Sequence, residues 1–184
     1  MQNKITFRIF VYLKNTDLHA LTAETTIKEI LNFQKLAGLK RYQLWEIEFD
    51  TTDLTVAQEQ LSKILNTTYY LINPNKEAYV LHNLKKKPLD SAKTLFGVLV
   101  NNENLQKPGL KEKILRKTGI KISKIKKYLL WELLVEHQEA SQEELKIELT
   151  EKVIKASSLE KGLLINPLFE DYQFVDLAEY YDFS

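Results

Sequence analysis

The two tryptophans of this chain stand in two similar segments, and a repeated segment constrains a fold more than any local pattern does. Residues 40–50 read KRYQLWEIEFD and residues 126–136 read KKYLLWELLVE, so Trp45 and Trp131 are 86 positions apart. One short match can arise by chance. The interpretation therefore depends on whether other segments repeat in the same order.

Two further pairs of segments do so. With the shift of 86, residues 7–15 (FRIFVYLKN) correspond to residues 93–101 (KTLFGVLVN), which aligns Phe10 with Phe96. The segment LINPNKEAY that begins at Leu71 corresponds to LINPLFEDY at a shift of 93, so the second copy holds seven extra residues before this point. Three blocks in one order indicate a duplicated chain.

The duplication predicts the domain organisation. We expect one repeat over residues 1–82 and a second over residues 93–175, followed by an acidic, aromatic tail over residues 176–184. The linker, residues 83–92, contains three lysines, a proline and small polar residues, which suit an exposed connection. A chain of 184 residues favours two cores of about 90 residues each that lean on each other.

The periodicity predicts strand, helix, strand, helix and short strand in each copy. Apolar residues alternate with polar ones over residues 5–13, and Trp45, Ile47 and Phe49 share one face of the next strand. Helices are expected over residues 26–35 and 54–65 of copy one, over residues 110–117 of copy two, and after a capping box at Ser141 and Glu144. Asn-Pro pairs should end the second helices, and short strands are expected over residues 78–81 and 172–175.

These elements predict the α+β class. Each repeat should be a small antiparallel three-stranded sheet with two helices on one face. Such a sheet is marginal by itself, so the two repeats should pair around a pseudo-twofold axis, and the linker makes that pairing intramolecular.

Composition excludes several classes of protein. The net charge is +1, which provides no global field to recruit nucleic acid or anionic lipid, and the absence of cysteine removes disulfides, thiolate nucleophiles and the common structural zinc sites. No apolar run approaches the roughly 20 residues that cross a bilayer, and Lys4 and Arg8 interrupt the first apolar stretch. We expect a cytoplasmic protein without a membrane partner.

A family resemblance is carried by the strand with the Trp-Glu-Leu sequence, the following helix and the segment LLINPLFEDYQF at residues 163–174. These resemble the small S subunit (PurS) of phosphoribosylformylglycinamidine synthase, whose chains end in a similar Asn-Pro-x-x-Glu-Asp-Tyr segment. That family is a homodimer of chains about half this length, so the sequence looks like a tandem fusion of two PurS-like repeats. The first copy lacks the aspartate of the motif.

The resemblance implies a non-catalytic scaffold in purine biosynthesis. In that family the S dimer bridges a glutaminase subunit, which releases ammonia, and a synthetase subunit, which uses ATP to form the amidine. The partners implied here are those two subunits of the ligase, with further self-association possible. The residues expected at a repeat or partner interface are Trp45, Asn73, Pro74, Glu77, Tyr79, Trp131, Asn166, Pro167, Glu170, Asp171 and Tyr172.

The residues themselves contain no recognised catalytic motif. The five glycines form no phosphate-binding loop, and His19, His82 and His137 lack the spacing of metal ligands. Glu46 and Glu132 are equivalent and could form a pair of carboxylates across the axis, but exposed positions on the outer strand face beside basic neighbours are the favoured interpretation. We expect no catalytic residue, no metal ligand and no cofactor.

Two alternatives stay open. Residues 111–127 (KEKILRKTGIKISKIKK) hold eight basic residues and one acid, so a diverged module could bind nucleic acid weakly through this run. The acidic segment over residues 132–151 and the lack of interleaved aromatic residues count against this. The tail over residues 176–184 is either a docking peptide or a packed or frayed terminus.

Overall fold

The computed structural model describes residues 4–81, 92–136, 141–155 and 162–177. Residues 83–91 of the predicted linker and residues 178–184 of the tail lie outside the described residues. The elements in chain order are β1 (Ile5–Leu13), α1 (Leu18–Glu29), β2 (Leu36–Phe49), α2 (Leu54–Thr67), β3 (Glu77–Leu81), β4 (Lys93–Asn101), the 3-10 turn η1 (Glu103–Leu105), α3 (Leu110–Thr118), β5 (Ile122–Glu136), α4 (Gln142–Leu149), the π-helical turn η2 (Thr150–Ile154) and β6 (Asp171–Val175).

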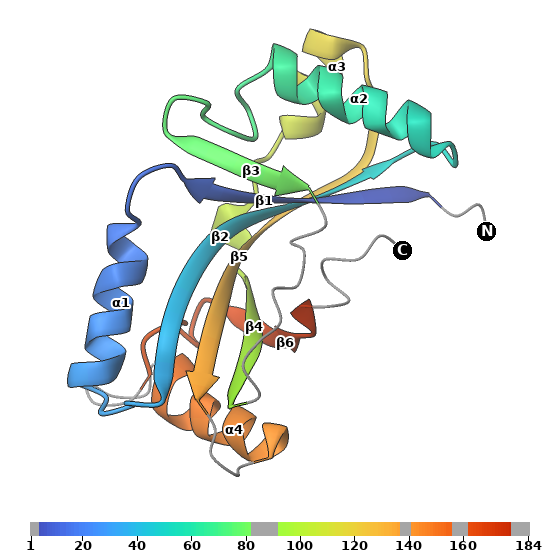
Figure 1. Cartoon of the computed structure of the whole chain (residues 1–184). Coiled ribbons are helices and arrows are strands. Elements are labelled where there is room, and N and C mark those ends of the chain that lie inside the picture. The colour runs from blue at the N-terminus through green and yellow to red at the C-terminus, as the bar shows by residue number, and fades with distance from the viewer. Residues whose placement is uncertain (1–3, 82–91, 137–140, 156–161, 178–184) are drawn as a thin grey trace.

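The strands form one antiparallel sheet in the order β3-β1-β2-β5-β4-β6 (Figure 1). The first half of the chain supplies β3, β1 and β2, and the second half supplies β5, β4 and β6. The α+β class and the antiparallel pairing are therefore confirmed. The two three-stranded sheets are joined edge to edge through β2 and β5, because these two strands pair along almost their whole length.

The pairing of β2 with β5 relates the two halves by a pseudo-twofold axis. Trp45 lies opposite Lys127, and Arg41 lies opposite Trp131. Residues shifted by 86 therefore exchange places across the pair, and the axis passes where Gln43 lies opposite Leu129. The remaining strands are arranged around the same axis, because β3-β1-β2 of the first half corresponds in order to β6-β4-β5 of the second half.

The predicted alignment of the first strands is wrong. Ile9 pairs with Trp45 and Val98 pairs with Trp131, so β1 and β4 correspond at a shift of 89 instead of 86. Phe10 does not correspond to Phe96, because a shift error of three exchanges the two faces of a strand. The shift of 93 for the short strands is confirmed, because Val11 pairs with Tyr79 as Val100 pairs with Tyr172.

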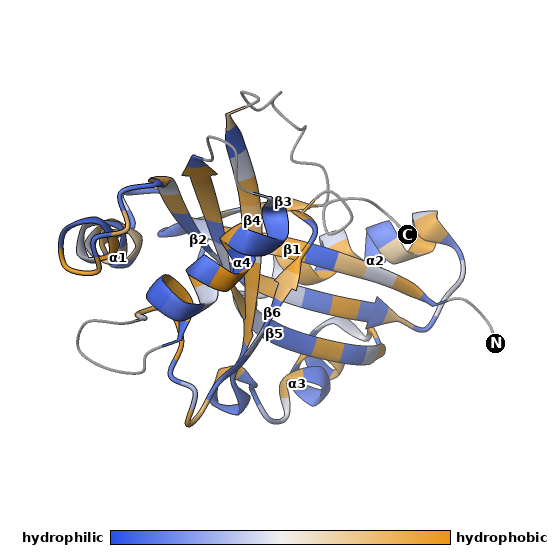
Figure 2. Ribbon diagram, turned by 90° about the horizontal axis from the view of Figure 1, so that it is seen from below, coloured by the Kyte–Doolittle hydropathy of each residue, from blue (hydrophilic) through white to orange (hydrophobic). Residues whose placement is uncertain are grey.

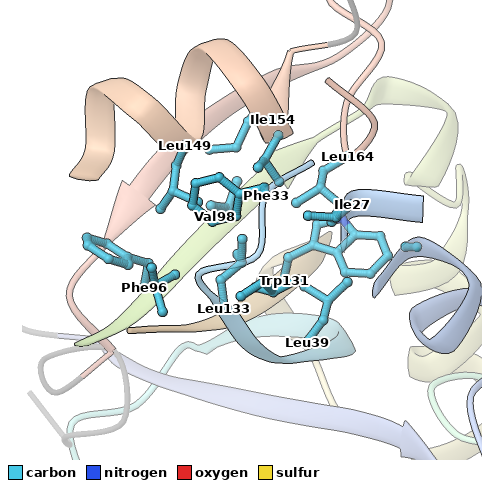
Figure 3. Packing of buried hydrophobic residues seen from close by; sticks show 14 of the residues in the cluster. Ile27, Phe33, Leu39, Phe96, Val98, Trp131, Leu133, Leu149, Ile154 and Leu164 are labelled. Carbon is cyan, nitrogen blue, oxygen red and sulfur yellow. The ribbon is translucent and has the colours of Figure 1, made fainter. Parts of the chain in front are cut away.

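The expectation of one core per repeat is also wrong, because each core is built from both halves. In one cluster Ile27 of α1 packs among residues of the second half that include Trp131, Val98 and Leu149 (Figure 3). In the other, Ile114 of α3 packs among residues of the first half. The physical reason is strand length: β2 has 14 residues and β5 has 15, whereas β1 and β4 have 9, so each central strand extends beneath the other half.

Both composite cores lie on one face of the sheet. Leu39 belongs to the first cluster and Trp45 to the second, and residues separated by an even number of positions in a strand share a face. The helices α2 and α3 lie together at one end of the long strands and α4 at the other end (Figure 1). Figure 2 shows the alternation of hydrophobic and hydrophilic residues along the strands. A third cluster, around Phe10, Leu44 and Leu130, lies on the opposite face.

Most local predictions are confirmed, with two exceptions. The Asn-Pro pairs do not end the second helices, because α2 ends at Thr67, six positions before Asn73, and η2 ends at Ile154, well before Asn166. The capping box forms, because Ser141 Oγ accepts from the Glu144 N–H at 3.3 Å and Glu144 Oε2 accepts from the Ser141 N–H at 2.8 Å. The first helix of copy one is not at residues 26–35 but at Leu18–Glu29. Its start is fixed by Asp17, whose side chain caps the first turn, and the chain after it includes Asn32 in the left-handed region at φ 53°.

Candidate functional site

The two tryptophans are core residues at corresponding places in the two clusters. Trp45 is 1% exposed and donates from Nε1 to the Leu71 carbonyl at 3.0 Å. Trp131 is 6% exposed, and its Nε1 has no hydrogen-bond partner among the described residues. Cations lie over both rings, with Lys127 Nζ 5.2 Å from the Trp45 centroid and Arg41 Cζ 5.9 Å from the Trp131 centroid. The tryptophans join the repeats and are not presented to a partner.

The Asn-Pro-x-x-Glu segments form two turns with the same hydrogen bonds. In copy one the Asn73 N–H donates to Glu77 Oε2 at 2.7 Å, and in copy two the Asn166 N–H donates to Glu170 Oε2 at 2.8 Å. Each asparagine side chain accepts from the N–H two residues later, at 3.1 Å in both copies. The motif residues therefore fix a rigid turn that leads into an edge strand.

The remaining motif residues differ between the copies. Tyr79 is 41% exposed on β3. Tyr172 is half-buried on β6, where its hydroxyl lies 3.3 Å from Thr150 Oγ1 and Lys155 lies over its ring. Asp171 is exposed at the start of β6. Because β3 and β6 are the two opposite edges of the sheet, the predicted site residues do not converge on one site.

The turn of copy two presents two large apolar side chains to solvent. Leu168 is 82% exposed and Phe169 is 68% exposed. The turn holds them in place, because the Leu168 N–H donates to Asn166 Oδ1 and the Phe169 N–H donates to the Asn166 carbonyl. At the shift of 93 the residues of copy one are Asn75 and Lys76, which are polar. An exposed apolar pair on a rigid turn is typical of a protein-binding surface.

The equivalent glutamates do not form a pair. Glu46 accepts from Arg8 Nε at 3.0 Å, and Glu132 accepts from Lys40 Nζ at 3.0 Å. Glu46 and Lys40, the partner of Glu132, are six positions apart on β2. This is roughly 20 Å along a strand, too far for the two glutamates to act together as acid and base. The prediction of basic neighbours is confirmed, but neither glutamate is exposed as expected: Glu132 is buried, at 6%, and Glu46 is half-buried.

A tyrosine accompanies each glutamate on the outer face of the sheet. Burial raises the pKa of Tyr42, and the charge of Glu132 raises it further. Burial likewise raises the pKa of Tyr128, and the charge of Glu46 and a hydrogen bond with it add to the effect. Both phenols therefore stay protonated; Tyr42 is buried and Tyr128 is half-buried.

Two lysines approach each other at Trp45. Lys107 Nζ lies 5.5 Å and Lys127 Nζ 5.2 Å from the ring centroid. Burial lowers the pKa of Lys127, and the neighbouring charge of Lys107 lowers it further, whereas Glu77 raises it. The basic run over residues 111–127 begins at α3 and continues into β5, and Lys111 reaches the Ser123 carbonyl at 3.3 Å.

A cavity of about 490 Å³ opens where β1 leaves the sheet and α1 begins. Its charged groups are largely paired, since Arg41 donates to both oxygens of Asp17, at 3.0 and 3.1 Å. The remaining wall is mainly apolar and aromatic. The apolar and aromatic lining residues are Tyr12, Leu13, Ala20, Leu21, Leu39, Tyr42 and Val80.

No group of three or more potential metal ligands is found among the residues that the structure describes, and His82 and His137 lie outside them. None of the helices over these ranges has the length and apolar character needed to span a bilayer.

The fold and its surfaces define an α+β protein built on a six-stranded antiparallel sheet. No protein-family model, no curated protein and no solved structure matches the chain. The surfaces described above are therefore the basis for a functional interpretation, together with the sequence motifs.

Sequence reasoning missed the cavity and the apolar pair Leu168 and Phe169. The cavity is formed by residues from β1, α1, β2 and β3 that share no motif. The apolar pair lies inside the Asn-Pro motif. The sequence signal that could have identified it is two large apolar residues directly after Asn-Pro, where the other copy has polar residues.

Proposed function

We propose that this chain is a non-catalytic scaffold of the PurS type, a subunit of phosphoribosylformylglycinamidine synthase in de novo purine biosynthesis. In this role it holds the glutaminase and the ATP-dependent synthetase together in the cytoplasm so that ammonia passes between them. The chain contributes surfaces and no reacting group. Its two repeats replace the two subunits of a homodimer.

The architecture supports the proposal. A PurS homodimer in one polypeptide requires two copies related by a twofold axis, and the β2–β5 pairing has this relation with the axis at Gln43 and Leu129. Both copies of the Asn-Pro-x-x-Glu motif that carries the resemblance form the same hydrogen-bonded turn. The motif is thus a structural unit that occurs twice, at opposite edges of one sheet.

The observation that carries the binding role is the exposed pair Leu168 and Phe169, at 82% and 68%. Aromatic and large aliphatic side chains supply much of the energy at protein interfaces. Their rigid turn reduces the entropy that is lost when a partner binds. Because copy one has Asn75 and Lys76 at these positions, the two edges can bind different partners, as a bridge between two unlike enzymes requires.

Reconstitution tests the proposal. The full chain is mixed with the synthetase and the glutaminase of the same organism, with and without glutamine, and the mixture is analysed by size-exclusion chromatography. A complex of all three proteins is expected, and amidine formation should require this chain when glutamine is the nitrogen source but not when ammonia is supplied. Failure to form a complex under both conditions would contradict the scaffold role.

A double variant tests the surface. Leu168→Asn with Phe169→Lys gives copy two the residues of copy one, and we expect it to weaken partner binding by at least about ten-fold, which is about 1.4 kcal/mol. Ile147→Asn is the matched control, because Ile147 is an apolar residue of α4 that is 60% exposed and lies away from the turn. Equal binding by the double variant and the control would remove this surface from the proposal.

A second candidate function is favoured by one observation. None of the eight basic residues in the run over residues 111–127 forms an ion pair within the described part of the chain, whereas Lys4, Arg8, Lys40 and Arg41 all do. A diverged repeat protein could therefore bind nucleic acid through α3. A labelled RNA or DNA oligonucleotide that binds at low salt, with a steep loss as salt rises and no binding to either enzyme, would favour this function over the scaffold.

A further inference from the structure

The cavity between β1 and α1 has a counterpart in the second half of the molecule, and that counterpart is filled. The pseudo-twofold axis exchanges Arg41, which lines the cavity, with Lys127. At Lys127 the side chain of Gln106 covers the strand: Gln106 Nε2 donates to the Lys127 carbonyl at 2.7 Å, and the Lys127 N–H donates to Gln106 Oε1 at 3.2 Å. A carboxamide thus takes the place of a neighbouring strand.

The difference between the halves follows from the length of one connection. Between β4 and α3 the chain has residues 102–109, which include the turn η1 and Gln106. Between β1 and α1 it has only residues 14–17, because Asp17 already caps the helix. The shorter connection includes Asn15 and Thr16, which line the cavity, but neither side chain forms with Arg41 the pair of hydrogen bonds that Gln106 forms with Lys127. The cavity of about 490 Å³ is the space that remains.

The backbone of Arg41 faces this space. In an antiparallel sheet the N–H and C=O of one residue point to the same neighbouring strand. Arg41 and Lys127 are related by the pseudo-twofold axis, so their backbone groups point to corresponding sides of β2 and β5. Since the groups of Lys127 point away from β2 toward Gln106, those of Arg41 point away from β5. The ladder between β1 and β2 ends at Val11 and Gln43. Strand β1 continues to Leu13, which this register places opposite Arg41, but the two residues form no ladder pair and both line the cavity.

The other walls of the cavity indicate which kind of residue lies beside the carboxamide in a ligand. Tyr12 and Tyr42 pack edge to face, with ring centroids 6.3 Å apart, and Leu21 and Val80 add apolar surface. The Arg41 side chain is held by Asp17, so its backbone position is fixed before a ligand arrives. Such a cavity suits a short extended peptide that has an amide side chain next to an apolar residue.

We propose that this cavity binds an extended segment of a partner protein, with a glutamine or asparagine side chain on the Arg41 backbone in the way that Gln106 lies on Lys127. The neighbouring apolar residue of the segment fills the space beside Tyr12 and Tyr42. The inference rests on the scaffold role, since it names one surface through which a partner is held. It does not involve the turn with Leu168 and Phe169.

The second half of the chain provides the probe. A synthetic peptide with the sequence of residues 101–109, NNENLQKPG, is added to the ¹⁵N-labelled full chain and followed by ¹H–¹⁵N correlation spectra. We expect the largest shift at the Arg41 amide, in the direction of a new hydrogen bond, with smaller shifts at Tyr12, Leu21 and Tyr42. The same peptide with Gln106→Met should bind about ten-fold more weakly, because it can neither donate to nor accept from the strand.

Two protein variants complete the test. Leu21→Trp fills the cavity and should abolish the shifts, whereas Leu18→Trp, on an exposed α1 residue that does not line the cavity, should leave them unchanged. The proposal is overturned if the peptide causes no shift at millimolar concentration, if the Gln and Met peptides bind equally, or if Leu21→Trp binds like the parent protein.

Failure of the cavity proposal can be distinguished from failure of the scaffold role. If the complex with the synthetase and the glutaminase forms with undiminished affinity in the Leu21→Trp variant, the scaffold role stands and the cavity proposal fails. If the peptide binds at Arg41 and neither enzyme binds the chain, the cavity proposal stands as a peptide site and the scaffold role fails.

Discussion

Gln43 lies directly opposite Leu129 in the β2–β5 pair, and these two residues are also equivalent members of the two repeats. They differ in chemistry, so the pseudo-twofold axis relates backbones more closely than side chains. The same divergence is seen where Gly97 stands at the position of Arg8, by the shift of 89, and where Gln106 fills a site that is open in the first half. A fused pair allows each copy to change independently.

The hydrogen bonding of the two tryptophans predicts different responses to mutation. Trp45→Phe removes the bond from Nε1 to the buried Leu71 carbonyl and leaves that oxygen without its donor, whereas Trp131→Phe removes a donor that has no partner in the described structure. We expect Trp45→Phe to lower the free energy of unfolding by about 1–2 kcal/mol more than Trp131→Phe. Urea unfolding of both variants measures this. An equal or larger loss for Trp131→Phe would contradict the hydrogen-bond assignment.

Gly97 is required by close packing against the C-terminal segment. A Cβ at this position would lie 2.7 Å from Val175 Cγ2 and 2.7 Å from Leu177 Cδ2. We expect Gly97→Ala to destabilise the protein by about 1–3 kcal/mol, because the core would be overpacked.

Gly38 is the control, since a Cβ there would lie 4.0 Å from its nearest neighbour, Leu134. Gly38→Ala should be neutral or stabilise by up to about 1 kcal/mol, because glycine loses more backbone entropy on folding than alanine does. Thermal unfolding of the two variants decides the point. Similar melting temperatures for both would show that the segment with Val175 and Leu177 does not pack on β4 as described.

The ion pair between Lys35 and Glu148 joins the first half of the chain to α4, and it predicts a dependence of stability on pH. The hydrogen bond from Lys35 lowers the pKa of Glu148, with a further contribution from Lys152. A lowered pKa in the folded state means that the stabilisation is present above the unfolded value, near 4.5, and is lost as the pH falls through the folded value.

Lys35→Met should therefore lower the free energy of unfolding by about 0.3–1 kcal/mol near neutral pH, since the pair is partly exposed, and this difference from the parent should vanish in acid. Lys146→Met is the control, because its partner Glu143 is 77% exposed. Urea unfolding over a pH series measures both. A difference that persists unchanged in acid would show that the loss comes from packing of the lysine side chain.

The turn of copy two depends on Glu170 for two bonds. Its Oε2 accepts from the Asn166 N–H and its Oε1 accepts from Asn102 Nδ2 at 2.9 Å, whereas Glu77 of copy one has one short bond and one of 3.4 Å from Gln43. We expect Glu170→Ala to cost about 1 kcal/mol more than Glu77→Ala. Hydrogen exchange at the amides of residues 166–170 reports the opening of the turn in Glu170→Ala, and exchange at residues 73–77 reports it in Glu77→Ala. Faster exchange in neither variant would assign the turn's rigidity to proline alone.

The sequence predicted the elements well where the signal was local. The capping box at Ser141, the apolar stripe of α2 and the short strands that follow the Asn-Pro pairs are local patterns, and all are present in the structure. The sequence predicts the first helix of copy one at residues 26–35, later than α1, because the apolar pattern of α1 is weak and its start depends on the single cap Asp17.

What the sequence did not predict depends on contacts between the halves. Ile9 corresponds to Val98 because Ile9 pairs with Trp45 and Val98 pairs with Trp131. An alignment of the two repeats by residue identity does not include this strand pairing. The composite cores could not be predicted, because the sequence does not show that α1 packs on the second half and α3 on the first half. Of the residues expected at an interface, those of the Asn-Pro motif form two turns at opposite edges of the sheet. The exposed residues to which the proposal assigns binding, Leu168 and Phe169, are the two that the motif leaves variable.

The central claim is that each half completes the core of the other, and fragment complementation tests it most directly. Residues 1–82 and 93–184 are produced separately and examined by circular dichroism and ¹H–¹⁵N spectra, alone and mixed. We expect each fragment to be unfolded alone, because Ile27 and Ile114 then lose the half against which they pack, and the equimolar mixture to give the spectrum of the intact chain. A cooperative unfolding transition for either fragment alone would contradict the claim.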